Sequence, residues 1–97
     1  MLDEQSISKV KEIAGELYPD MVAFAQKLVQ TPSISGTEQA LADLDLLEMQ
    51  KLGYDEVFRD AHGNIVGIVK GTEPGPTIMY NSHMDHVSPG DVANWQG

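Results

Sequence analysis

A short apolar run that leads into a histidine and an aspartate constrains this chain more than any other stretch of its sequence. The run covers residues 78–80, and His83 and Asp85 follow it. An uninterrupted apolar run is typical of a strand that is covered on both faces. In sheets flanked by helices, ligands and catalytic groups gather at the carboxyl ends of the strands. The sequence therefore predicts a buried strand over residues 77–82, with a candidate site at its end.

Helical patterns precede this strand. Ser6 or Ser8 is expected to cap a first helix, in which apolar residues recur at helical spacing until Pro19 interrupts it and starts a second helix. The two helices could also form one kinked rod. A third helix is predicted from a Thr37 cap to a stop at Gly53. The spacing of apolar residues then changes to that of strands, over residues 56–60 and 64–70. A turn at residues 62–64 is expected to join these two strands into a hairpin. The predicted fold is α/β, with helices first, then a hairpin and a buried strand.

His83 and Asp85 are the candidate site residues. Side chains at positions i and i+2 of an extended segment point the same way, so both could face one cavity. A neutral imidazole is a good zinc ligand, and such a ligand usually donates its other N–H to a carboxylate or a carbonyl. A lone His-x-Asp is a weak motif, however, and an ordinary polar strand end accounts for the same two residues. Catalytic zinc usually takes three protein ligands, so the others are expected beyond Gly97.

The remaining polar side chains of interest are expected to be structural. His86 adjoins the pair but should point away from it in an extended segment. His62, which is far along the chain from the site, is expected to be a solvated turn residue. Trp95 could line a pocket or simply pack. Three acidic residues of the third helix are predicted to form a solvated face: Asp43, Asp45 and Glu48. Ser33 and Ser35 are predicted to lie in a loop and not to act as nucleophiles.

Charge and cysteine content restrict the partners. The net charge is −9, with 15 acidic and 6 basic residues, so there is no basic patch for nucleic acid or an anionic membrane. The chain has no cysteine, which excludes a disulfide framework and a thiolate zinc site. The first residues are acidic and do not form a signal peptide. We therefore expect a cytoplasmic protein that binds neither nucleic acid nor an anionic membrane.

Three segments together resemble one enzyme family. Residues 28–35 are similar to its entry loop, in which a helix leads into a Pro-Ser pair. Residues 63–67 resemble its Gly-Asn strand start, and residues 78–87 resemble its strand followed by His-x-Asp-x-Val. The family is that of the aminoacylases, acetylornithine deacetylases and succinyl-diaminopimelate desuccinylases, which are dinuclear zinc metallopeptidases. Residues 88–95 are most similar to its selenium-metabolism-linked hydrolases.

The resemblance implies a fold, an activity and two residue roles. Residues 1–97 would be the N-terminal portion of a three-layer αβα catalytic domain, without the lid domain that usually forms a homodimer. The full-length enzyme would be a hydrolase that cleaves an amide bond of a small N-acyl amino acid or short peptide. His83 would ligate one of two Zn²⁺ ions, which Co²⁺ or Mn²⁺ could replace, and Asp85 would orient His83. The general base and the remaining ligands would lie beyond Gly97, so residues 1–97 alone are expected to be inactive.

The chain departs from the family pattern at Tyr80 and His86, where other residue types are usual. Two alternatives stay open. A metallo-β-lactamase-like hydrolase would use Asp85 and His86 as ligands, although Asn81 stands where its first histidine belongs. A non-catalytic α/β binding module would carry the His-x-Asp pair by chance.

Overall fold

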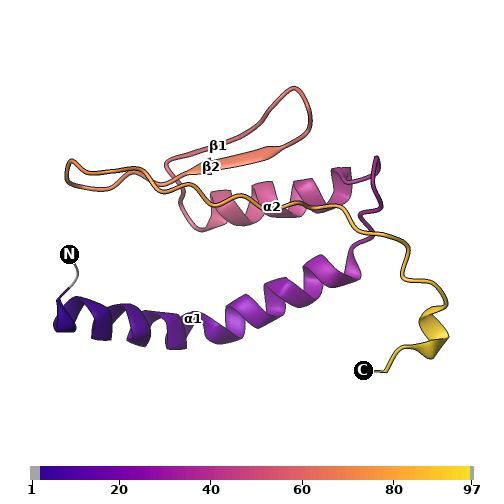
Figure 1. The fold of residues 1–97 in the computed structure, drawn as a ribbon, viewed down its shortest axis with the longest axis horizontal. Coiled ribbons are helices and arrows are strands. Elements are labelled where there is room, and N and C mark those ends of the chain that lie inside the picture. The colour runs from indigo at the N-terminus through magenta and orange to yellow at the C-terminus, as the bar shows by residue number, and fades with distance from the viewer. Residues whose placement is uncertain (1–2, 97) are drawn as a thin grey trace. The chain divides into compact units, whose positions relative to one another are not determined.

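The computed structural model describes residues 3–96 and shows a mixed α/β architecture. In chain order the elements are α1 (Glu4–Gln30), α2 (Gln39–Lys51), β1 (Glu56–Arg59), β2 (Ile65–Ile68) and a short 3-10 helix, η1 (Val92–Asn94) (Figure 1). The chain divides into two compact units between Gln30 and Thr31. The first unit contains α1, and the second contains everything that builds the candidate site. No helix in the described part of the chain is long and apolar enough to cross a membrane.

α1 is one continuous helix, which agrees with the kinked rod that the sequence leaves open beside two separate helices. It begins after Asp3, whose carboxylate accepts the N–H of Ser6 at 2.8 Å, so Asp3 provides the cap expected from a serine. Pro19 lies inside the helix. Proline removes one i→i−4 hydrogen bond and bends a helix, and the ribbon of α1 bends near its middle (Figure 1). The backbone hydrogen bonds before and after Pro19 keep the helix continuous at this position.

α2 and the hairpin form the packed part of the second unit. β1 and β2 are antiparallel, with Phe58 opposite Val66, which confirms the predicted hairpin. α2 contacts both strands (Figure 1). The closest approach is at Gly67 of β2, where an added Cβ would lie 2.6 Å from Met49 Sδ and 2.7 Å from Tyr54 Cδ2. Only glycine leaves room for the helix and the tyrosine ring at this distance.

The two ends of α2 differ in how well the sequence predicts them. Gly53 has φ +80° and follows the last turn, so the predicted stop is confirmed. The residue at the N-cap position is Glu38, not Thr37. The Thr37 hydroxyl donates to the carbonyl of Ile34 at 2.7 Å, which ties it to the preceding loop and not to the helix.

The predicted third strand does not form in the described residues. Ile78, Met79 and Tyr80 are 74%, 86% and 92% exposed, and no hydrogen-bonded ladder includes them. A strand needs a neighbour for its backbone N–H and C=O groups. Within residues 3–96, β1 and β2 pair only with each other, so this extended segment has no partner and the expectation of burial on both faces is wrong.

The turn between β1 and β2 is organised by Asp60. Its Oδ1 accepts the backbone N–H groups of His62 and Asn64, each at 2.9 Å, and its Oδ2 accepts the Asn64 side-chain amide at 2.8 Å. Gly63 takes a positive φ of 87°, while Asn64, which the sequence also allows to do so, does not. The hydrogen bonds from Asn64 are the main reason why the pKa of Asp60 lies below its ordinary value.

We expect Asp60→Ala to lower the thermal unfolding temperature of the full-length protein, because three donors in the turn lose their acceptor. Since the folded-state pKa is lowered, the contribution of Asp60 is complete above the ordinary aspartate pKa of 3.8 and is lost as the pH falls through the lowered value. Thermal unfolding at neutral pH and at about pH 2 measures both effects. Glu73→Ala, in an exposed loop, is the control. Equal unfolding temperatures for the two variants at neutral pH would contradict the prediction.

Candidate functional site

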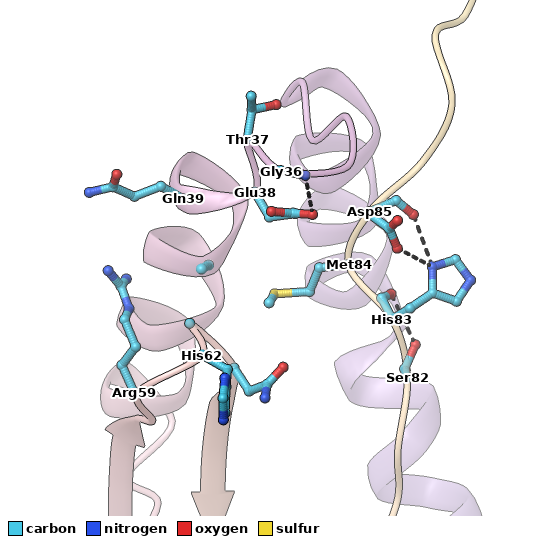
Figure 2. A pocket seen from close by; sticks show the side chains of 13 residues that line it. Gly36, Thr37, Glu38, Gln39, Arg59, His62, Ser82, His83, Met84 and Asp85 are labelled. Atoms are coloured by element: carbon cyan, nitrogen blue, oxygen red, sulfur yellow. Dashed lines mark hydrogen bonds and ion pairs between the residues drawn. The ribbon is translucent and has the colours of Figure 1, made fainter.

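His83 and Asp85 lie on the same side of the extended segment, as the sequence predicts. Figure 2 shows the two side chains together, with Met84 between them pointing to the opposite side. The Nδ1 atom of His83 is 3.2 Å from Asp85 Oδ1 and 2.9 Å from the backbone oxygen of Asp85. Both neighbours of Nδ1 are acceptors, so Nδ1 carries the proton of the neutral ring. The other nitrogen, Nε2, then holds the lone pair that a metal ion requires.

The His83 ring is open to solvent. Its side chain is 85% exposed, and the Asp85 side chain is 41% exposed. An exposed imidazole whose Nδ1 already has a hydrogen-bond partner can bind a metal ion at Nε2 without rearranging. The pair therefore has the geometry of a metal-binding histidine and its orienting carboxylate.

A serine from a distant loop completes the contacts of Asp85. The Ser35 hydroxyl donates to Asp85 Oδ2, across a separation of 50 residues. This bond is the main reason why the pKa of the Asp85 carboxyl lies below its ordinary value. Desolvation opposes it, and a smaller charge interaction with His83 adds to the lowering. Asp85 is thus kept ionised, which suits an acceptor for the imidazole N–H. The sequence indicates a loop at Ser35 but no partner, because nothing local connects the two positions.

His86 points away from the pair, as predicted, but it has a definite structural role. Its Nε2 accepts the backbone N–H of Ser33 at 2.9 Å, and its Nδ1 is 2.8 Å from the carbonyl oxygen of Val87. The backbone N–H of His86 donates to the carbonyl of Ser33 at 2.9 Å, next to a parallel bridge between Ile34 and His86. These contacts fasten the loop that carries Ser35 to the segment that carries Asp85. We call them, together with the Ser35–Asp85 bond, the clasp.

Ser33 is the most deeply buried residue of the clasp. Its exposure is 0%, and its hydroxyl has no hydrogen-bond partner among the described residues. A buried hydroxyl without a partner adds nothing to stability, so this serine contributes through its backbone groups. Its side chain is also shielded from any substrate, in agreement with the prediction that it is not a nucleophile.

A cavity of about 810 Å³ opens between α2, the hairpin turn and the His83 segment (Figure 2). His62 is an exposed turn residue, as the sequence predicts, and it also lines this cavity. The turn that carries His62 is distant from His83 in the sequence, but the hairpin brings it to the wall of the cavity that faces Met84 (Figure 2). Polar groups on this wall also come from Arg59, which pairs with Asp43, and from Asn64.

The acidic residues of α2 are not all solvated. Asp43 forms an ion pair with Arg59 of β1. Asp45 and Glu48 are half-buried, and burial raises the pKa of Asp45. The solvated face predicted for these three residues is therefore wrong in part. Trp95 does not line the cavity, and its indole N–H donates to the carbonyl of Pro89 at 3.0 Å.

The described residues do not form a metal site by themselves. Over residues 3–96 there is no group of three histidine, cysteine, aspartate or glutamate side chains placed to hold an ion. Glu38 reaches the cavity, but its carboxylate accepts the N–H of Gly36 at 2.8 Å. A metal bound at His83 would need further ligands from elsewhere.

Comparison with known proteins identifies relatives in Escherichia coli. The chain is 34% identical over 86 residues to the "Uncharacterized protein YgeY" of Escherichia coli strain K12 and to the protein of the same description in E. coli O157:H7. The alignment covers 89% of this chain and 21% of each relative. The chain therefore spans about a fifth of the length of the curated relatives it matches. No protein-family profile and no solved structure matches the chain.

Proposed function

We propose that the full-length protein is a metal-dependent hydrolase that cleaves an amide bond of a small N-acyl amino acid or short peptide. The observation that carries the proposal is the geometry of His83, whose Nδ1 is bound by Asp85 and whose Nε2 is left for a metal ion. The resemblance of three segments to the zinc metallopeptidase family supports the same activity. It also supports a three-layer αβα catalytic domain, a cytoplasmic location and a homodimer for the full-length protein.

In this proposal each residue of the pair has one task. His83 would hold one of two Zn²⁺ ions through Nε2. Asp85 accepts the Nδ1 proton, fixes the ring and makes Nε2 more basic. When bound, the zinc ions supply a water of lowered pKa and polarise the amide carbonyl. The general base that takes the proton of that water, and the other ligands, would come from outside residues 1–97.

The structure favours His83 with Asp85 over the metallo-β-lactamase-like alternative. That alternative needs His86 as a ligand. Both ring nitrogens of His86 are occupied by backbone groups, the N–H of Ser33 and the carbonyl of Val87. Metal binding at His86 would require both bonds to break and the clasp to open.

The test is metal analysis and an activity panel on the full-length protein. We expect bound zinc, hydrolysis of at least one N-acyl amino acid, dipeptide or N-carbamoyl amino acid, and loss of activity with a chelator. Restoration by Zn²⁺, Co²⁺ or Mn²⁺ identifies the working metal. Hydrolysis of a β-lactam alone would favour the alternative hydrolase. A metal-free protein without turnover would favour the non-catalytic binding module and reject the proposal.

A further inference from the structure

We propose that Ser35 is a positioning residue that locks the Asp85 carboxylate, so that Asp85 presents the His83 ring with Nε2 outward. Three groups are connected in a row, the Ser35 hydroxyl, the Asp85 carboxylate and the His83 imidazole. The expected effect on metal affinity rests on the proposed function. The expected effect on the His83 ring does not, because it concerns the protein without metal.

The two oxygens of Asp85 have separate partners. Oδ2 accepts the Ser35 hydroxyl, and Oδ1 lies 3.2 Å from His83 Nδ1. The torsion that rotates an aspartate carboxylate is broad, so a single contact leaves the carboxylate free to turn. A second contact on the opposite oxygen removes that freedom. Since the His83 side chain is 85% exposed and has little packing of its own, its orientation depends on Asp85.

Ser35 is suited to this task because its loop is held on both sides. Before it, Ser33 exchanges two hydrogen bonds with His86, each 2.9 Å long. After it, the N–H and hydroxyl of Thr37 bond to the carbonyl of Ile34 at 2.8 and 2.7 Å. A positioning group acts only when its own support is fixed, and here the support includes the segment that carries Asp85.

The chemistry of the donor also matters. A lysine or arginine at position 35 would neutralise Asp85 and reduce its pull on the imidazole proton. A serine hydroxyl supplies one directed bond and no charge, so Asp85 keeps its full negative charge for His83. The orienting effect and the electrostatic effect of the carboxylate are thus both preserved.

The experiment compares four forms of the full-length protein: wild type, Ser35→Ala, Ser35→Thr and Ser33→Ala. The first readout is ¹⁵N NMR of histidine-labelled, metal-free protein, with His83 assigned by its absence in His83→Ala. We expect a single Nδ1–H tautomer in the wild type and a mixture in Ser35→Ala. The second readout is zinc affinity, which should fall about 10- to 100-fold in Ser35→Ala, as for other groups behind a metal ligand.

The other two variants separate positioning from general loop structure. Ser35→Thr keeps a hydroxyl and should restore the single tautomer. Ser33→Ala removes a hydroxyl without a partner from the same loop and should behave like the wild type. An unchanged tautomer in Ser35→Ala, no rescue by threonine, or an equal change in Ser33→Ala would each overturn the inference. If the wild type binds no zinc, the proposed function fails, while the tautomer of the metal-free protein still decides the role of Ser35.

Discussion

Replacing His83 with alanine in the full-length protein is expected to lower kcat/KM for amide hydrolysis by more than about 100-fold. Loss of a group that only supports a metal ligand lowers metal affinity or activity by about 10- to 100-fold, and loss of the ligand itself should cost more. The bound zinc should fall by about one ion per chain, because one ion of a two-metal site loses a nitrogen ligand. Metal content by elemental analysis and steady-state kinetics measure the two effects.

The fold should tolerate this change. The His83 side chain is 85% exposed, and within residues 3–96 its ion pair and its hydrogen bond are both with Asp85. Surface substitutions usually change stability by less than about 0.5 kcal/mol, so the unfolding temperature of the metal-free variant should stay within about 2 °C of the wild type. Glu73→Ala, purified in parallel, controls for handling. Full activity and full zinc content in His83→Ala would reject the assignment of His83 as a ligand.

Gly67→Ala should destabilise the full-length protein by about 1–3 kcal/mol, and Gly67→Val by more, because the new side chain overpacks the contact between β2 and α2. Two effects oppose each other at this position. Glycine in a strand costs about 0.5–1 kcal/mol relative to alanine, so an uncrowded site would gain from the change. The added Cβ, however, would lie 2.6 Å from Met49 Sδ and 2.7 Å from Tyr54 Cδ2. The methionine side chain is flexible, whereas Tyr54 Cδ2 belongs to a rigid ring and is close to its own backbone, so it yields less easily.

Urea unfolding with a linear extrapolation gives the free energies for this comparison. The matched control is Gly75→Ala, where an added Cβ has no heavy atom within 4 Å. We expect Gly75→Ala to be neutral or slightly stabilising. If Gly67→Ala stabilised the protein as much as Gly75→Ala, the close packing of β2 on α2 would be disproved.

Features that depend on near neighbours in the sequence could be predicted. The alternation of an extended segment placed His83 and Asp85 on one side, and turn-forming residues between two apolar runs gave the hairpin. Gly53 marked the end of α2 because few other residues adopt its positive φ. Each of these rests on contacts within a few residues.

Features that depend on distant partners could not be predicted. An apolar run such as residues 78–80 predicts a strand only if another strand pairs with it, and the described chain provides none. The bond from Ser35 to Asp85 spans 50 residues and leaves no local pattern. His62 reaches the cavity because the hairpin folds onto α2, which a pass along the sequence does not reveal. At Pro19 the sequence left one kinked helix and two separate helices both open, since a helix can continue past one missing bond.

The clasp has a consequence for the order in which the chain folds. Ser33 and His86 are 53 residues apart, and closing an unstructured loop of that length costs about 3.5 kcal/mol of chain entropy. The two hydrogen bonds between them return only about 0.5–1.5 kcal/mol each. These two bonds therefore cannot close the unstructured loop by themselves. α2 and the hairpin lie between the two residues and shorten the loop when they fold, so we expect them to form before the Ser33–His86 contacts.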